Sequence, residues 1–251
     1  MIEQTKQVLT DLKCFGMLES LDMRLAQATS HGWGHVELVS SLITDERTYR
    51  ENQKIKRRIR MASFRTDACF ERLDMTAKRN LSKTQVQDLM MLSFIKEPRN
   101  VVIIGPTGVG KTFLATALGN HACRSGFNVT FMGVHMLMER IMLARADGSF
   151  LRFRERLARV DLLILDDLGL KKLPPEIVQD LYDILEERYH TKSLIITSQL
   201  PIANWKEIIE DPVAYEAIMD RIIHGAVTLT LTGESYRKRR YNEPRQPKLD
   251  S

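Results

Sequence analysis

The sequence has few cysteines and no long apolar run. Its three cysteines, Cys14, Cys69 and Cys123, lie far apart, without a Cys-x-x-Cys pair or paired histidines nearby. This spacing indicates neither a zinc site nor a disulfide framework. No apolar run approaches the roughly 20 residues that a membrane-spanning helix needs. The chain begins in amphipathic sequence without a basic stretch and an apolar core, so we expect no signal peptide, no membrane partner and a cytoplasmic protein.

The composition is that of a globular protein large enough for one big domain and a smaller one. Hydrophobic residues make up 43% and charged residues 27% of the 251 positions, which allows a substantial core. No internal repeat is evident. The net charge of +5 permits a nucleic-acid partner, but the distribution of charge matters more than the total.

A phosphate-binding pattern lies near the middle of the chain. Four apolar residues at 101–104 predict a buried strand, and the sequence GPTGVGKT follows directly. The glycines let backbone N–H groups converge on a phosphate, and the helix expected at 113–122 adds its positive N-terminal dipole. Lys111 would reach the β- and γ-phosphates of ATP, and the Thr112 hydroxyl would ligate Mg²⁺. A glycine turn that binds nothing is the alternative. The predicted nucleotide-binding residues are Gly105, Pro106, Thr107, Gly108, Val109, Gly110, Lys111 and Thr112.

Two further predicted strands end in polar residues. The apolar run at 160–165 is followed by Asp166 and Asp167, at the end of a parallel strand where such sheets bind ligands. Asp166 suits the magnesium shell, and Asp167 suits orientation or deprotonation of an attacking water; capping of the following loop is the alternative. The strand at 193–198 is followed by Gln199, whose amide suits the lytic water or the γ-phosphate.

Basic residues are concentrated in two places that suit contact with DNA phosphates. Residues 47–60 hold seven Lys or Arg against Glu51 alone, on a stretch that predicts a helix. Without a negative partner these cations would repel one another, although a solvated charged face is the other interpretation. A second cluster follows at 140–159. The candidate DNA-binding residues are Arg47, Arg50, Lys54, Arg57 and Arg58 in the first cluster, and Arg140, Arg145, Arg152 and Arg156 in the second.

These motifs and the exact residues within them resemble those of a known family. The similarity is to the IstB-like insertion-sequence helper ATPases, in the IstB/DnaC-like branch of AAA+ ATPases, and it covers nearly the whole chain. The segments that carry it are residues 100–112, 161–169 with Asp-Asp-Leu-Gly, 197–201, 220–225 and 233–237. The resemblance implies an α/β fold: an AAA+ P-loop core with a parallel five-stranded sheet between helices, a small helical N-terminal domain and no full C-terminal lid. We expect domains at 1–70 and 71–240 and a disordered tail at 241–251.

The resemblance also implies roles for individual residues. It implies Walker A at 105–112, Walker B at Asp166 and Asp167, a sensor 1 position at Gln199, an arginine finger at Arg221 and a sensor 2 substitute at Arg237. Many AAA+ proteins carry Glu where Asp167 stands, so hydrolysis is expected to be slow or to need closure by DNA. An arginine finger given in trans completes a site only when a neighbouring subunit docks, and head-to-tail contacts generate rings or helices.

The function expected is therefore that of an ATP- and Mg²⁺-dependent ATPase that forms a head-to-tail homo-oligomer on duplex DNA with little sequence specificity. It would prepare the target DNA and recruit or stimulate a partner transposase. The first alternative is a helicase loader that resembles DnaC and acts on single-stranded DNA. The second is a nucleotide-gated DNA scaffold whose hydrolysis is incidental. A small-molecule P-loop kinase is disfavoured by the Asp-Asp strand end and by Arg221.

Overall fold

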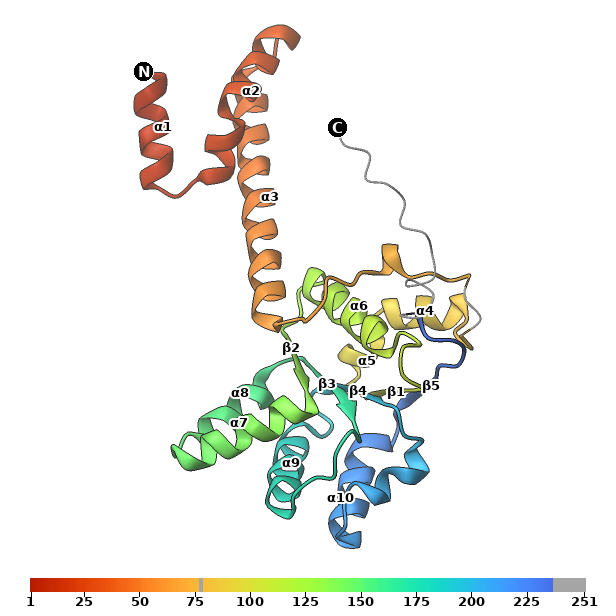
Figure 1. Ribbon diagram of the computed structural model, residues 1–251. Coiled ribbons are helices and arrows are strands. Elements are labelled where there is room, and N and C mark those ends of the chain that lie inside the picture. The colour runs from red at the N-terminus through yellow and green to blue at the C-terminus, as the bar shows by residue number, and fades with distance from the viewer. Residues whose placement is uncertain (77–78, 237–251) are drawn as a thin grey trace, which may run out of the picture. The chain divides into compact units, whose positions relative to one another are not determined.

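The computed structural model describes residues 1–76 and 79–236 (Figure 1). Contacts divide the chain into two compact units, Met1–Arg57 and Arg58–Ser251. The domain boundary expected at residue 70 stays a prediction, and the expected tail at 241–251 lies outside the described residues, as does Arg237. None of the described helices is both long and apolar enough to cross a membrane.

The first unit consists of helices α1 (Ile2–Asp11), α2 (Phe15–His31) and the first part of α3 (His35–Ala62). Gly32 ends α2 with a φ of +65°, a left-handed conformation that favours glycine. The buried carboxylate of Glu46 on α3 accepts hydrogen bonds from the N–H groups of Gly16 (2.7 Å) and Met17 (3.2 Å). An acid on α3 therefore caps the N-terminus of α2.

The second unit is built on five parallel strands in the order β2-β3-β4-β1-β5. The strands are β1 (Val101–Ile104), β2 (Val129–Gly133), β3 (Leu162–Leu168), β4 (Ser193–Ser198) and β5 (Val227–Thr230). The helices are α4 (Lys83–Met90), α5 (Ser93–Lys96), α6 (Lys111–Arg124), α7 (Val134–Ala146), α8 (Phe150–Arg159), α9 (Pro175–Arg188) and α10 (Pro212–Ile223). Two 3₁₀ turns, η1 (Phe70–Arg72) and η2 (Ile202–Glu207), complete it. The predicted AAA+ P-loop core with its five-stranded parallel sheet is confirmed.

Helices cover both faces of this sheet (Figure 1). Alternate β1 residues point to opposite faces: Val101 and Ile103 join the core under α6, whereas Val102 and Ile104 join the core under α7, α9 and α10. A strand buried on both faces needs an uninterrupted apolar run, which explains the sequence at 101–104. Full burial of each such side chain contributes roughly 1.5–3 kcal/mol to the free energy of folding.

The strand register brings the polar strand ends together. Ile104 of β1 lies opposite Ser198 of β4, and Gly133 of β2 lies opposite Asp166 of β3. The register of β3 against β4 shifts between Leu165 and Leu168, because the backbone bulges there. Strand β3 thus extends past the expected end at 165 and includes both aspartates.

Candidate active site

The glycine-rich loop at 105–112 connects β1 to α6 at the carboxyl edge of the sheet. Gly108 has a φ of +85°, and a side chain there would overlap with Ser235. Behind the loop run residues 231–236, which we name the C-terminal strap. Leu231 N donates to Ile104 O (2.7 Å), and Tyr236 N donates to Gly108 O (2.9 Å). The strap therefore binds the backbone directly before the loop and again at Gly108.

The Lys111 side chain lies within the loop itself. It is only 5% exposed, and its Nζ donates hydrogen bonds to Gly105 O (2.7 Å) and Pro106 O (3.0 Å). Helix α6 starts at Lys111, so the N–H groups of its first turn face the loop. Backbone N–H groups at a helix N-terminus and a primary ammonium are the groups with which proteins bind anions.

Asp166 is buried at 1% exposure beside this loop, between two hydroxyl groups. Thr112 Oγ1 lies 2.9 Å from Asp166 Oδ1, and Thr197 Oγ1 lies 2.6 Å from the same oxygen. Burial and, to a smaller degree, the nearby charge of Asp167 raise the pKa of Asp166, whereas the two hydroxyl groups counteract the rise. The carboxylate is thus placed where a cation would stabilise its charged form.

Asp167 occupies the bulge of β3 with an unusual backbone conformation. Its φ is +61°, and its N–H donates to Thr197 Oγ1 (2.9 Å). Few residues other than glycine adopt this conformation, although aspartate does so more readily than most. The bulge interrupts, at these two aspartates, the regular alternation of side chains between the two faces of the sheet.

Gln199 directly follows β4 and touches the phosphate loop. Thr107 Oγ1 donates to Gln199 Oε1 at 2.6 Å. The structure therefore brings together the loop with Lys111, the two aspartates and Gln199, all of which the sequence analysis had selected.

Arg221 is not part of this group. Its backbone carbonyl accepts a hydrogen bond from Asn100 Nδ2 (2.8 Å), and Asn100 directly precedes β1, whereas the phosphate loop follows β1. Four strand residues span roughly 13 Å, so Arg221 lies toward the opposite edge of the sheet from its own chain's phosphate loop.

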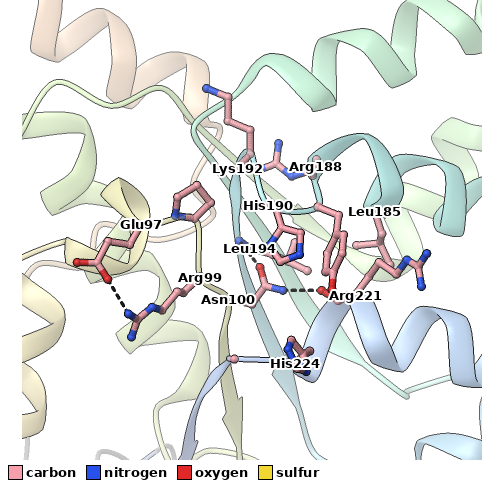
Figure 2. Close-up of a pocket in the computed structure, with 13 residues that line it drawn as sticks. Glu97, Arg99, Asn100, Leu185, Arg188, His190, Lys192, Leu194, Arg221 and His224 are labelled. Atoms are coloured by element: carbon pink, nitrogen blue, oxygen red, sulfur yellow. Dashed lines mark hydrogen bonds and ion pairs between the residues drawn. The ribbon is translucent and has the colours of Figure 1, made fainter.

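The Arg221 guanidinium has partners at that edge. Its Nε donates to Glu186 (2.7 Å), and Nη2 donates to the Tyr182 hydroxyl (3.3 Å). Hydrogen bonding to Glu186 raises the pKa of Arg221, so the side chain is a firmly charged cation. Figure 2 shows it at a pocket of about 300 Å³, whose lining also includes Arg99, His190, Lys192 and His224.

Comparison with known proteins now identifies the family. The family described as IstB-like ATP binding protein matches residues 7–244. The chain belongs to this family. An insertion-sequence ATP-binding protein of Sinorhizobium fredii is 38% identical over 93% of this chain and 96% of its own length. The IS21 ATP-binding protein of Pseudomonas aeruginosa is 30% identical over 94% and 89%.

Solved structures share the fold of this IstB-like chain. The crystal structure of DnaI matches with a TM-score of 0.57 at 20% identity, over 66% of this chain and 92% of that one. The DnaC helicase loader matches with a TM-score of 0.51 at 22% identity, over 62% and 94%. Aquifex aeolicus DnaA bound to AMPPCP matches with a TM-score of 0.57 at 20% identity, over 67% and 51%.

In the first basic cluster, most of the cations are exposed. Arg47, Lys54 and Arg57 are exposed, whereas Arg58 is half-buried. Arg50 is also largely exposed, but its Nε donates to Glu46 at 2.6 Å. The charge of Arg50 is therefore partly neutralised by the carboxylate that caps α2.

Among the four candidate DNA-binding arginines of the second cluster, Arg145 is held by an ion pair. Its guanidinium forms a bidentate ion pair with the buried Asp180 of α9 and lies 4.3 Å from the ring centroid of Phe150. It fastens α7 to α9. Arg140, Arg152 and Arg156 are exposed and line a groove of about 440 Å³ between α7 and α8.

Sequence reasoning missed two contributors to the site. Thr197 was treated only as a strand residue, yet its hydroxyl connects both aspartates. Its position before Gln199 at the end of a parallel strand was the available signal. Arg79, which lies against the phosphate loop, had no signal in its local sequence.

Proposed function

We propose that this IstB-like chain is an ATPase that assembles head-to-tail on duplex DNA and recruits or stimulates a partner transposase. The observation that carries the proposal is the hydrogen-bonded group of Thr112, Asp166 and Thr197 beside the phosphate loop. Its expected compartment is the cytoplasm, where ATP and DNA occur together.

The loop at 105–112 would hold the phosphates of ATP. Lys111 would exchange the Gly105 and Pro106 carbonyls for phosphate oxygens, which are stronger partners for an ammonium. The Thr112 hydroxyl and the Asp166 carboxylate fit Mg²⁺, because hard divalent cations prefer oxygen ligands and Asp166 is a buried acid. When bound, Mg²⁺ would neutralise charge that develops on the phosphates.

Asp167 and Gln199 would act on the attacking water. Asp167 would accept a proton from the water while the water oxygen bonds to the γ-phosphorus. The bond between the γ-phosphorus and the bridging oxygen of the β-phosphate would break, which yields ADP and phosphate. Gln199, which accepts a hydrogen bond from Thr107, would orient the water or contact the γ-phosphate. The half-buried position of Asp167 leaves it accessible to water.

Arg221 would serve a neighbouring subunit. The position of its backbone next to Asn100, before β1, supports an arginine finger that acts in trans. Such a finger contributes about 10³- to 10⁵-fold in rate in related nucleotide hydrolases. Before it could act, Arg221 would have to exchange Glu186 for the neighbour's nucleotide.

DNA would bind through exposed cations, with Arg47, Lys54 and Arg57 as the first candidates and Arg140, Arg152 and Arg156 as the second. Phosphate contacts carry little sequence information, so we expect little specificity. Six or more such contacts would lower the affinity about a thousandfold or more between roughly 50 and 200 mM salt.

Sedimentation of the protein with ATP or ADP, on duplex and on single-stranded DNA of equal length, tests this proposal at two salt concentrations. We expect a large, salt-sensitive assembly only with ATP and duplex DNA, and none with Lys111→Ala. Assembly of Lys111→Ala at normal ATP concentrations would contradict a role for ATP at the subunit interfaces. A preference for single strands would favour a helicase loader instead. Addition of the transposase to the duplex assembly then tests recruitment.

A further inference from the structure

Arg79 is a buried cation on the segment that precedes α4. It is 8% exposed, and its backbone carbonyl accepts a hydrogen bond from Thr232 N of the C-terminal strap (3.0 Å). The centre of its guanidinium lies 3.9 Å from the ring centroid of Tyr236. Two chain segments that are distant in sequence therefore hold this side chain in one position.

The guanidinium points at the phosphate loop. A Cβ atom placed on Gly110 would lie 2.9 Å from Arg79 Nη1. Gly110 is the residue before α6, so its surroundings include the N–H groups of the first helical turn. A fixed positive charge here adds to the anion-binding character of the loop and of Lys111.

Within the described part of the chain, the Arg79 guanidinium has no hydrogen-bond acceptor. The charge of Asp74 interacts with that of Arg79, but the Asp74 carboxylate accepts its hydrogen bonds from Thr76 Oγ1 (2.6 Å), Thr76 N (2.8 Å) and the Tyr236 hydroxyl. A guanidinium carries five donors in a planar arrangement that matches phosphate oxygens. The Tyr236 ring and the charge of Asp74 act on this guanidinium, but burial of a guanidinium whose donors lack acceptors is costly, unless an anion completes its hydrogen bonds.

We propose that Arg79 binds the phosphate chain of a nucleoside di- or triphosphate held in the loop at 105–112, and that the Tyr236 ring keeps the guanidinium in place. The inference rests on the proposed function only in that ATP is taken to bind at this loop. It adds a second cation to Lys111, supplied by the segment before α4.

Calorimetric titration of the full chain with ADP and ATP, in the presence of Mg²⁺, tests the proposal. We expect Arg79→Met to weaken both affinities by about 10- to 100-fold, the range typical of a lost hydrogen bond to a charged group. Arg79→Lys should retain part of the affinity. The matched control is Arg72→Met: Arg72 lies on the same segment, but its exposed side chain pairs with Asp67, so we expect wild-type affinity.

Two further variants separate a direct contact from an indirect one. Tyr236→Leu removes the stacked ring but leaves the Arg79 charge, so it should weaken binding less than Arg79→Met. Equal losses of affinity in Tyr236→Leu and Arg79→Met would show that the strap matters rather than the guanidinium, and would overturn the inference. An affinity of Arg79→Met within twofold of the wild type would also overturn it. Lys111→Ala tests the proposed function itself: if the wild type binds no nucleotide, or binds it regardless of Lys111, the proposed function fails and the inference fails with it.

Discussion

The Thr197 hydroxyl donates a hydrogen bond to Asp166 across two neighbouring strands, with 2.6 Å between the two oxygen atoms. Parallel strands bring their carboxyl ends to one edge of a sheet, so a hydroxyl at the end of β4 meets an acid at the end of β3. The acid is buried, and its charged form is costly without a cation.

Substitution of Asp166 by Asn should stabilise the nucleotide-free protein. The pKa of Asp166 is raised in the folded state, so the folded protein holds the carboxyl proton more tightly than the unfolded chain does. The free energy of unfolding therefore falls as the pH rises from the usual pKa of a carboxyl group through the raised pKa of Asp166. Asp166→Asn removes that loss, and we expect a gain of roughly 0.5–2 kcal/mol at pH 7. The same variant should lose the stabilisation that Mg²⁺ and ATP give together. Urea denaturation with and without Mg-ATP measures both effects.

Asp161→Asn is a control for which we expect a change in stability of the opposite sign. Burial would raise the pKa of Asp161, but the hydrogen bonds from Lys192 and from Asn128 N outweigh burial and lower it. The charge of Asp161 therefore stabilises the fold at pH values above the usual pKa of a carboxyl group. The Asn variant should be less stable than the wild type at pH 7. A loss of stability in Asp166→Asn at pH 7 would contradict our account of that site.

Asp167→Asn should separate nucleotide binding from hydrolysis. Asparagine tolerates the left-handed backbone at this position as aspartate does, so the fold and the affinity for ATP should persist. Loss of the proton acceptor should lower the steady-state ATPase rate by about 10²- to 10⁴-fold. Phosphate release, measured beside an ATP titration, gives both values. If Asp167→Asn still supports transposition, the protein acts as a nucleotide-gated scaffold.

The two basic clusters can be separated by the salt dependence of duplex binding. Each lost phosphate contact reduces the slope of log affinity against log salt by roughly 0.9. We expect Lys54→Ala combined with Arg57→Ala to reduce it by about two such steps. Arg140→Ala combined with Arg152→Ala is the matched double variant of the second cluster. An unchanged slope in both would contradict both proposed DNA surfaces.

Glu46→Gln should loosen the start of α2 in a pH-dependent way. Burial opposes the charge of Glu46, but hydrogen bonds from Arg50 and from the N–H groups of Met17 and Gly16 outweigh it and lower its pKa. The charge of Glu46 therefore stabilises the fold at pH values above the usual pKa of a carboxyl group. This stabilisation is lost as the pH falls through the lowered pKa of Glu46. We expect faster amide exchange at 15–20 in the variant at pH 7, and a smaller difference near pH 3.

Glu51→Gln is the control for that comparison. Glu51 lies on the same helix, is exposed and belongs to the basic stretch rather than to the cap of α2. Its exchange at 15–20 should match the wild type at both pH values. Equal exchange in Glu46→Gln and the wild type at pH 7 would show that the buried carboxylate does not hold the helix.

Local patterns in the sequence predicted the elements that depend on local chemistry. The apolar run at 193–198 matches β4, and the loop at 105–112 lies between a strand and a helix as expected. Burial on both faces and the glycine-rich turn are each visible in a few neighbouring residues.

Pairings between distant residues were not visible in this way. Arg145 was predicted as a candidate for contact with DNA, but Asp180 on another helix binds it. The bulge at Asp167 depends on the register against β4. Arg79 and Tyr236 meet only because the C-terminal strap and the segment that precedes α4 both lie against the loop at 105–112. Short-range patterns carry no information on such contacts, since each partner alone is compatible with many neighbours.

The C-terminal strap has a consequence for the order in which the protein matures. The loop at 105–112 leaves the ribosome well before β5, which pairs with β1, and before the strap residue Tyr236, which binds Gly108. Contacts of such long sequence separation form late in folding. A nascent chain therefore carries the loop at 105–112 before the backbone that supports it has been made.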